Sequence, residues 1–405
     1  MLQNYLKIAF RNLQRNKVYS FINIAGLAVG MAVAMLIGLW VWDEVSFNKS
    51  HKNYDRIAQV WQNVKFDADV ATYSSLPIPL AEELRSKYPD FEAVSVASNN
   101  YAHILTMGNQ KFSKEGSFVE PDFTEMMSLK MIAGTRAGLK DVNSILLSES
   151  LAKTFFNSEN PLNKVIKIDN KANAKVVGVY EDFPNNSDFK DVHFLSTWKL
   201  YLTIEGNANN TKDEWDANSF LIYTQLKKEA DFEKVSVKIK DIRMKRDNPP
   251  PYKPAFFLHP MSKWHLYSDF KNGVNIGGIV TFVWLFGVIG LFVLLLACIN
   301  FMNLSTARSE KRAKEVGVRK AIGSMRGQLI SQFLSESLLV VVFAFVLSLL
   351  LVEFSLSFFN QVSDKNMSIL WSNPWFWLIG LGISLLTGLV AGSYPALYLS
   401  SFQPV

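Results

Sequence analysis

Four long apolar runs constrain the fold of this chain more than any other feature of its sequence. They cover residues 18–42, 276–302, 328–360 and 374–399. A helix needs about 20 mostly apolar residues to cross the hydrocarbon core of a bilayer, and each run is long enough. The second run contains no charged residue, which is typical of a membrane span and rare in a buried helix of a soluble protein. We therefore predict four transmembrane helices.

The first apolar run has the basic flank of a secretory signal peptide, because four basic residues precede it. A signal peptide, however, has an apolar core of about 7–15 residues followed by a small-residue cleavage site. The run at 18–42 is longer and ends with Trp40 and Trp42, where a membrane–water interface is expected. It is predicted to be a retained anchor.

The net charge of +6 comes from two short stretches beside the predicted helices. Residues 1–17 carry four basic residues and no acid, and residues 303–327 carry seven basic and two acidic residues. Residues 43–275 are almost balanced, with 30 basic and 31 acidic side chains. Because basic residues concentrate in cytosolic loops, both stretches are predicted to be cytosolic. The end at 400–405 then lies in the cytosol, and the loop at 361–373 lies in the periplasm. The high pI therefore reflects the orientation of the chain in the membrane and not nucleic-acid binding.

The first 17 residues also have an apolar helical face, with Leu2, Leu6 and Leu13 on it and Lys7 and Arg11 elsewhere. Such an amphipathic helix can lie flat on an anionic inner leaflet. A cytosolic extension of the first span fits the same pattern equally well.

The region 43–275 mixes helical and strand patterns and is predicted to be one α+β domain with two lobes. A helix is predicted at 149–156, and a hairpin joins strands at 165–168 and 175–179. The only cysteine, Cys298, lies in the second apolar run, so the domain is stabilised by its own hydrophobic core and not by disulfides. The predicted fold class is an α-helical membrane protein whose large α+β periplasmic domain is inserted between helices 1 and 2.

Small residues recur every four positions in the first and the fourth span. Such a face lets two helix backbones approach closely inside a membrane. We predict that both faces pack against protein, either within the chain or in a second copy. The residues are Gly26, Gly30, Ala34 and Gly38 in the first span, and Gly380, Ser384, Gly388 and Gly392 in the fourth.

The sequence carries no motif for catalysis or metal binding. It has no G-x-x-x-x-G-K-[ST] loop for ATP, no HExxH and no paired CxxC. Its five histidines are scattered at spacings that fit no usual metal site. The adjacent carboxylates Asp43 and Glu44 point apart and favour a solvated loop. The chain is predicted to be a non-enzyme without a metal or cofactor of its own.

The second basic stretch and the third span each hold a candidate site. Gly317 and Gly323 bracket a short helical turn that carries Arg319 and Lys320, and glycines permit tight turns and close backbone approach. This turn suits contact with a cytosolic partner, although an orientation signal explains the same composition. Glu336 lies about 13 Å into the third span. At that depth a carboxylate is either functional or paired with a loop base near the inner interface.

Residues 315–324, which read Glu-Val-Gly-Val-Arg-Lys-Ala-Ile-Gly-Ser, resemble the signature E-[IV]-G-[IV]-R-x-A-[IVL]-G-[AS] of the FtsX-like, or MacB-like, ABC-transporter permeases. The stretches at 4–13, 43–47, 176–184 and 298–308 are similar to that family too. The resemblance covers essentially the whole chain. The opening and the last of these stretches look most like large permeases of Bacteroidetes-type bacteria.

The resemblance implies a permease subunit of the bacterial inner membrane that works as a homodimer or pseudo-dimer with a separate ABC ATPase. ATP and Mg²⁺ would bind to that ATPase, whose dimerisation would move the cytosolic segment. The first two helices would pass the motion to the periplasmic domain, which is called mechanotransmission. Family members export antibiotics, peptides or lipoproteins, and a periplasmic adaptor and an outer-membrane channel are possible further partners. The residues that would dock on the ATPase are Glu315, Gly317, Arg319, Lys320, Ala321 and Gly323.

Two departures from the family pattern are visible. Some relatives carry the ATPase fused to their N-terminus, and others continue beyond residue 405 into a second repeat, so this chain resembles the first half of an eight-helix permease. The alternative function is a non-transporting signal transmitter that activates a periplasmic cell-wall hydrolase. The size of the domain at 43–275 favours the transporter.

Overall fold

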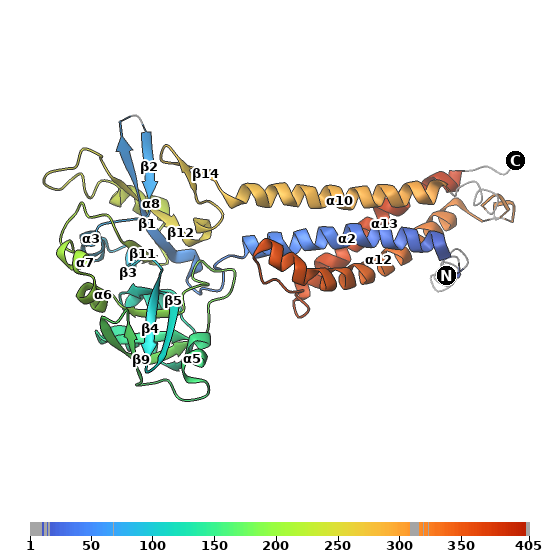
Figure 1. Ribbon diagram of the computed structural model, residues 1–405. Coiled ribbons are helices and arrows are strands. Elements are labelled where there is room, and N and C mark those ends of the chain that lie inside the picture. The colour runs from blue at the N-terminus through green and yellow to red at the C-terminus, as the bar shows by residue number, and fades with distance from the viewer. Residues whose placement is uncertain are drawn as a thin grey trace. The chain divides into compact units, whose positions relative to one another are not determined.

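The computed structural model contains two compact units, which are described separately. The helical unit combines Met1–Asp43 with Phe282–Val405, and the core domain is Glu44–Thr281 (Figure 1). The structure describes residues 10, 11, 14, 17–67, 69–307, 316–318, 320–322 and 324–401.

The helical unit is built from four long helices, α2 (Lys17–Val45), α10 (Ile279–Ala307), α12 (Arg326–Ser363) and α13 (Pro374–Ser401). Each is long and apolar enough to cross a membrane. The predicted fold class is thereby confirmed, with four candidate transmembrane helices and a mixed α and β domain between the first and the second. Pro374 begins α13 at a position where its missing N–H is not needed for a helical hydrogen bond.

The first and third long helices pack against each other through large apolar side chains. Leu27 and Met31 of α2 share a buried cluster with Val341 and Phe345 of α12. Farther along both helices, Leu39 shares a second cluster with Val352 and Leu356, so α2 and α12 run in the same direction. Burial of such side chains and close packing between the helices hold this pair together.

The core domain is built on one 12-stranded sheet with the order β10-β7-β9-β8-β4-β5-β3-β11-β1-β12, to which β2 and β6 add at the sides. A separate hairpin contains β13 and β14. The strands are β1 (Ile57–Phe66), β2 (Asp69–Tyr73), β3 (Phe91–Ala97), β4 (Tyr101–Met107), β5 (Gln110–Val119), β6 (Met131–Gly134), β7 (Ser144–Ser148), β8 (Val165–Ile168), β9 (Ala172–Tyr180), β10 (Phe194–Thr197), β11 (Leu221–Leu226), β12 (Ala255–Pro260), β13 (Asp269–Lys271) and β14 (Val274–Gly277).

One half of the sheet closes into a barrel. Strand β10 pairs antiparallel with β7 on one side and parallel with β5 on the other, so β10, β7, β9, β8, β4 and β5 form a ring. Leu105, Phe118 and Phe194 from these strands are fully buried in the main core. Gly116 stands opposite Phe194 in the β5–β10 pairing, and a Cβ on it would lie 2.2 Å from the ring atom Cε1. The barrel can therefore close at this point only over a glycine.

The hairpin predicted within 165–179 is formed by β8 and β9, with Val165 opposite Lys175. Asp169 and Asn170 at its turn have φ angles of 49° and 57°. Two consecutive left-handed residues are the signature of a type I′ hairpin turn, which Asp and Asn tolerate well. The local sequence thus specifies this turn.

The other half of the sheet is open and antiparallel, and it consists of β3, β11, β1 and β12. It is covered by α3 (Pro79–Lys87) and α8 (Phe232–Ile239), which bury Leu80, Leu84 and Ile239 in the main core. The barrel and this open sheet are the two lobes of the domain. The remaining helices are α4 (Asp122–Met126), α5 (Glu149–Phe156), α6 (Trp198–Ile204), α7 (Gly206–Asn210), α9 (Met261–Trp264) and the 3₁₀ turns Tyr54–Arg56 and Arg136–Lys140.

We predict that Gly116→Ala destabilises the core domain by about 2 kcal/mol, because overpacking a tight site forces its neighbours apart. Urea unfolding of the detergent-solubilised protein, followed by fluorescence of the core-domain tryptophans, measures the change. Gly206→Ala is the matched control, since a Cβ there meets nothing within 4 Å. Equal stability of the two variants would contradict the close approach of Phe194.

Candidate functional site at the two ends of the core domain

The two ends of the core domain meet through Glu44, Phe47 and His265. Glu44 lies in the last turn of α2 and is 3 % exposed. The Nε2 atom of His265 pairs with its carboxylate, and the imidazole ring stacks on Phe47 with centroids 3.6 Å apart. A buried carboxylate needs a partner, because leaving it alone away from water is costly. This contact therefore fixes the point where the chain leaves α2 beside the segment that leads to α10.

Asn48 provides the backbone turn by which the chain leaves the helix. Its φ is 61°, a left-handed value that asparagine adopts more easily than most residues. Its side-chain Nδ2 donates to the Asp188 carboxylate at 2.6 Å, and its Oδ1 accepts from the Asp188 N–H at 3.0 Å. The Asn48 N–H donates to the Asn186 carbonyl at 2.9 Å. The turn is thus held on both its side chain and its backbone.

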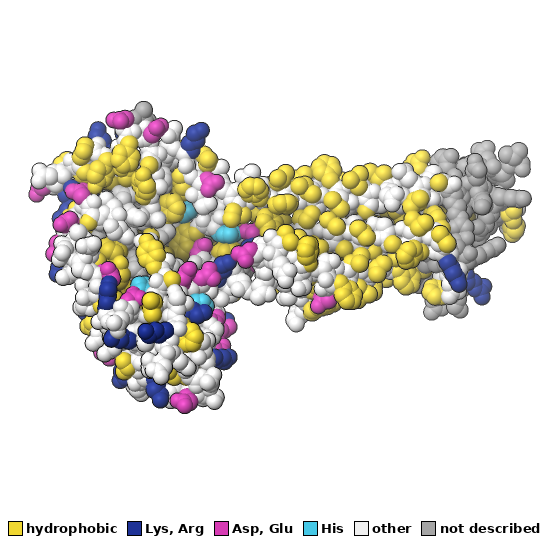
Figure 2. Space-filling model, viewed as in Figure 1, with side chains coloured by type: hydrophobic (Ala, Val, Ile, Leu, Met, Phe, Trp, Pro, Cys, Tyr) yellow, Lys and Arg dark blue, Asp and Glu magenta, His cyan; other side chains and the backbone are white. Residues whose placement is uncertain are grey.

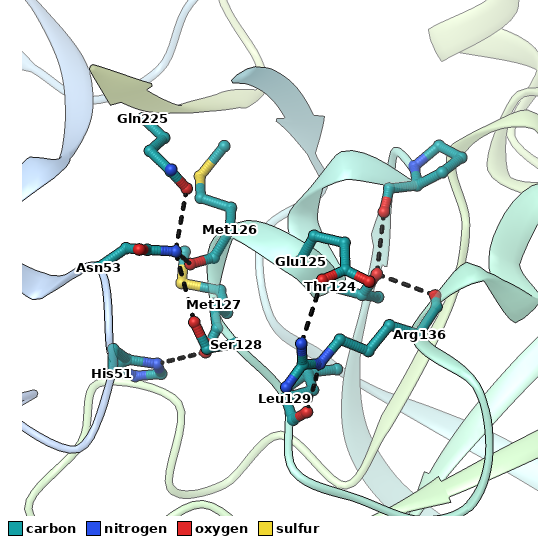
Figure 3. Close-up of polar contacts among 11 residues, drawn as sticks. His51, Asn53, Thr124, Glu125, Met126, Met127, Ser128, Leu129, Arg136 and Gln225 are labelled. Carbon is teal, nitrogen blue, oxygen red and sulfur yellow. Dashed lines mark hydrogen bonds and ion pairs between the residues drawn. The ribbon is translucent and has the colours of Figure 1, made fainter. Parts of the chain in front are cut away.

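His51 and Asn53 attach the same segment to the loop that follows α4 (Figure 3). The Nδ1 atom of His51 lies 2.9 Å from the Met127 carbonyl oxygen. The Nδ2 atom of Asn53 donates to the Met126 carbonyl and to Oε1 of Gln225, each at 3.2 Å. One asparagine therefore joins the loop to strand β11.

Arg136 holds the other end of that loop in place (Figure 3). Its Nε donates to the Leu129 carbonyl at 2.6 Å, and its Nη1 donates to the Glu125 carboxylate at 3.1 Å. The hydroxyl of Thr124 donates to the Arg136 carbonyl at 2.9 Å. The loop is closed on itself and presents fixed carbonyl groups to His51 and Asn53. We call the segment Glu44–Asn53, His265 and the residues that they contact the junction.

Two titratable groups of the junction are shifted toward their neutral forms. Burial raises the pKa of Asp188, although the Asn48 hydrogen bond and the nearby His265 and His51 act in the opposite direction. Burial also lowers the pKa of His51, against a backbone hydrogen bond with Met127. The junction is therefore held mainly by hydrogen bonds and packing around one buried acid–histidine pair.

The prediction that Asp43 and Glu44 form a solvated loop is wrong. Both lie in the last turn of α2. Adjacent residues of a helix point about 100° apart, so the two carboxylates reach different partners. Asp43 pairs with Lys365 in the helical unit at 2.8 Å, whereas Glu44 pairs with His265 in the core domain.

The predicted ATPase-docking residues lie in a short segment that the structure describes in part. Gly317, Lys320 and Ala321 are helical, and a Cβ on Gly317 would meet nothing within 4 Å. The other predicted docking residues lie outside the described ones, namely Glu315, Arg319 and Gly323.

Three apolar residues of this segment were not among the predicted docking residues. Val316 is buried against Leu329 and Phe333 of α12 and anchors the segment. Val318 and Ile322 are 55 % and 80 % exposed, and the Ile322 N–H donates to the Val318 carbonyl at 3.1 Å. Their i, i+4 spacing puts both on one face of a helical turn, and that spacing was the available signal.

The small residues of α2 lie against α10 at its middle. A Cβ on Gly30 would lie 2.4 Å from the Cβ of Ala297, and one on Gly26 would lie 3.4 Å from Nδ2 of Asn300. The two helices run in opposite directions, since the partner numbers fall as those of α2 rise. The backbones approach closely only because side chains here are small.

Farther along α2, the glycine that allows the close approach belongs to α10. A Cβ on Gly290 would lie 3.2 Å from Cγ2 of Ile37. Ala34 is half-buried, whereas a Cβ on Gly38 would meet nothing within 4 Å. Gly38 thus makes no close contact of this kind within the described part of the chain.

The small residues of α13 lie against α12. A Cβ on Gly388 or Gly392 would lie 2.6 or 2.8 Å from side-chain atoms of α12, and one on Gly380 would lie 3.0 Å from the ring of Phe345. Ser384 is buried, and its hydroxyl donates to the Gly380 carbonyl at 2.7 Å. This face also belongs to a contact within the chain.

Glu336 is half-buried on α12. Gln332, one turn earlier and buried, donates from Nε2 to its carboxylate at 3.3 Å. Among the described residues, no group of three His, Cys, Asp or Glu side chains is placed to hold a metal ion.

Two family models match the chain. The MacB-like periplasmic core domain matches residues 20–242, which is more than half of the sequence, and the FtsX-like permease C-terminal region matches residues 287–404. The chain belongs to the FtsX-like permeases with a MacB-like core domain. The resemblance noted from residues 315–324 is thereby confirmed.

Relatives of this FtsX-like permease include proteins named as ATP-binding/permease proteins and one named as a permease. It is 25 % identical over 420 residues to "Macrolide export ATP-binding/permease protein MacB" of Bdellovibrio bacteriovorus, covering 99 % of this chain and 61 % of that protein. It is 21 % identical over 439 residues to "Uncharacterized ABC transporter permease YvrN" of Bacillus subtilis, covering 99 % and 98 %. The periplasmic region of MacB from Actinobacillus actinomycetemcomitans matches with a TM-score of 0.37 and 20 % identity, over 52 % of this chain and 91 % of that structure. The permease thus spans about three-fifths of the length of the MacB relatives.

We predict that His265→Phe in this FtsX-like permease loosens the junction, because the Phe47 stack is kept but the buried Glu44 carboxylate loses its contact with the imidazole. Leaving a buried polar group without its hydrogen-bond partner costs about 1–3 kcal/mol, and more for a charged group. Hydrogen exchange of residues 44–53 reports the loss. The double variant Glu44→Gln/His265→Phe should recover much of the protection. Full protection in the single variant would show that Glu44 does not depend on His265.

We predict that His259, near the end of β12, makes the folded core domain less stable in acid. It is 3 % exposed, its ring packs near Trp61 and Phe270, and burial lowers its pKa to about 4. Below about pH 6.5, His259 binds a proton in the unfolded chain but stays neutral in the folded domain. The free energy of unfolding therefore falls as the pH drops from about 6.5 through about 4. The full loss corresponds to about 3 kcal/mol.

The variant His259→Gln removes this titration, and its unfolding free energy should depend less on pH over the same range. Urea unfolding at about pH 7 and about pH 4.5 measures the difference. An unchanged pH dependence in the variant would assign the acid sensitivity to other groups.

Proposed function

We propose that this chain is the permease subunit of an ABC transporter whose ATPase is a separate protein. Membership of the FtsX-like permeases supports this proposal, as do relatives whose names join an ATP-binding part to a permease part. The sequence itself has no phosphate-binding loop of the P-loop type. ATP and Mg²⁺ would act on the partner, which is expected at the cytosolic segment.

The antiparallel pair of α2 and α10 is the observation that carries the proposal. At one end of the pair the hydroxyl of Tyr19 donates to Ser305 at 3.2 Å, and at the other end the rings of Trp40 and Phe286 lie 5.0 Å apart. Glu44 lies in the last turn of α2, and its partner His265 lies in the segment that precedes α10. One helix pair therefore connects the cytosolic segment with the junction.

The distribution of aromatic and basic residues supports an inner-membrane location with the core domain in the periplasm. Tryptophan concentrates at membrane interfaces, and basic residues concentrate on the cytosolic side. Lys17, Lys320 and Arg326 belong to the ends of the helices away from the core-domain connections. The tryptophans of the helical unit belong to the opposite ends, and they are Trp40, Trp42, Trp284, Trp371, Trp375 and Trp377.

In the proposed cycle, closure of the ATPase pushes the turn that carries Gly317, Val318 and Ile322. The helix pair transmits this motion to the junction, where the loop contacts of His51 and Asn53 pass it into the core domain. Export of a substrate, or its handling in the periplasm, would follow from the movement of the two lobes. An ATPase dimer offers two equivalent docking surfaces. A second permease copy, or a second half of a longer chain, occupies the second of them.

We predict that Val318→Glu/Ile322→Glu weakens binding of the ATPase at least about tenfold, because two exposed apolar anchors become charged. Gly317→Trp should abolish the stimulation of ATP hydrolysis while leaving expression intact. Copurification and ATP hydrolysis in nanodiscs with the partner ABC ATPase measure both effects.

The matched control is Gly382→Trp on α13, where a Cβ also meets nothing within 4 Å but the position lies within an apolar span. It should bind and stimulate the ATPase like the parent chain. Normal stimulation by Gly317→Trp would contradict docking at this turn.

A further inference from the structure

The two helices that connect the membrane with the core domain are held very differently within the helical unit. In the most apolar window of each helix, 33 % of the residues of α2 are buried, against 11 % for α10 and 44 % for α12. Trp284 and Leu296 on α10 are 73 % and 64 % exposed. Helix α2 is therefore part of the packed bundle, whereas α10 lies on its outside.

Large interlocking side chains fix α2 to α12. Besides the cluster around Leu27 and Met31, a second cluster joins Leu39 to Val352 and Leu356 farther along both helices. Branched and bulky side chains that interdigitate in this way resist sliding, because each must leave its hole before the helix can shift.

The loop after α12 adds a second restraint at the end of α2. Lys365 is only 14 % exposed and pairs with Asp43 at 2.8 Å. Asn360 holds the loop in place, since its Nδ2 donates to the Met367 carbonyl at 2.8 Å and its Oδ1 accepts from the Met367 N–H at 3.0 Å. Met367 and Ile369 are buried in the same cluster as Leu39. We call residues 360–369 the brace.

The interface between α2 and α10 has small side chains in its middle and larger contacts at its ends, where Trp40 packs on Phe286 and the Tyr19 hydroxyl donates to Ser305. In the middle, Gly30 faces Ala297 and Gly290 faces Ile37. Toward its cytosolic end, α10 also reaches the bundle through Cys298 and Phe301, which share a small apolar cluster with Val340 of α12 and Ala391 of α13. Contacts of glycine and alanine offer no deep holes, so an axial shift of α10 disrupts less packing than one of α2.

The chain joins the two helices to the core domain in different ways. Helix α2 is continuous to Val45, and Glu44 in its last turn is already bound in the junction. Between His265 and the start of α10 stand Gly277 and Gly278, with φ angles of 113° and 139°. Such backbone conformations are open almost only to glycine, which makes this step the natural place for a change of direction.

From these observations we propose that α2 is an anchored strut and α10 is the moving element, which shifts along α2 and bends at Gly277–Gly278. Asp43 and Lys365 are then positioning residues, because their ion pair and the brace keep the end of α2 fixed to α12. This inference rests on the proposed function, since the force on α10 would come from the ATPase at the segment that directly follows Ala307. It assigns the motion to one helix of the pair.

Spin-label distances in the full permease with its ATPase test the proposal. In a Cys298→Ser background, Trp42→Cys/Leu291→Cys reports α2 against α10, and Trp42→Cys/Phe354→Cys reports α2 against α12; all three labelled side chains are exposed. Labelled chains are diluted with unlabelled ones, so that each distance arises within one copy. Between the nucleotide-free state and the state with ATP, Mg²⁺ and vanadate, the first distance should change by at least about 3 Å, the rise of two helical residues. The second should stay fixed.

Variants of Asp43 and Lys365 test the role of the brace in the same experiment. Lys365→Met should allow the α2–α12 distance to change with nucleotide, and the charge exchange Asp43→Lys/Lys365→Asp should fix it again. Lys271→Met, at an exposed lysine of β13, is the control and should leave both distances like those of the parent.

The outcomes separate this inference from the proposed function. Equal changes in both distances, or no change in either while the permease stimulates ATP hydrolysis, would overturn the anchored strut and leave the permease function standing. An unchanged α2–α12 distance in Lys365→Met would remove the positioning role of the brace. A permease that never stimulates the ATPase would refute the proposed function, and the inference with it.

Discussion

A domain inserted between two antiparallel membrane helices must bring its two ends back to one place, and the rest of this structure depends on how that is done. Here the return is made by a buried carboxylate, a histidine and a phenylalanine ring, with Glu44 and Phe47 on the outgoing chain and His265 on the returning one. A buried carboxylate is costly unless its hydrogen-bonding partner is in place, so this contact favours one arrangement of the two segments over others. Loops alone would leave their relative position open.

The membrane helices and much of the local structure of the domain follow directly from the sequence. Apolar length alone specifies the four spans, and the Asp169-Asn170 pair specifies the turn between β8 and β9, because these residues adopt left-handed angles. The closure of the barrel does not follow, since β5 and β10 are far apart along the chain and their pairing depends on a glycine lying under Phe194. No local pattern distinguishes Gly116 from a glycine in a loop.

The candidate site could be predicted only in part, for a related reason. The family-like residues indicated the turn around Gly317, but they did not include Val318 and Ile322. The exposure of these two side chains depends on the tertiary structure and not on the local sequence. Asp43 and Glu44 looked like solvated neighbours because each acquires its partner from a segment more than two hundred residues away. The small-residue face of α2 indicated close packing, yet the sequence could not reveal that α10 supplies the glycine at the next contact.

The order of the strands along the sheet also bears on how the protein is made. Strand β1 follows the first membrane helix almost at once, but its neighbours β11 and β12 come near the end of the domain. Pairing of segments so distant in sequence is slow, and unpaired strands are prone to aggregate while they wait. During biogenesis, β1 can pair with β2 at once, but its pairing with β11 and β12 must wait until nearly the whole domain has been synthesised. Completion of the sheet therefore coincides with the arrival of α10 at the insertion machinery, which couples folding outside the membrane to integration of the second span.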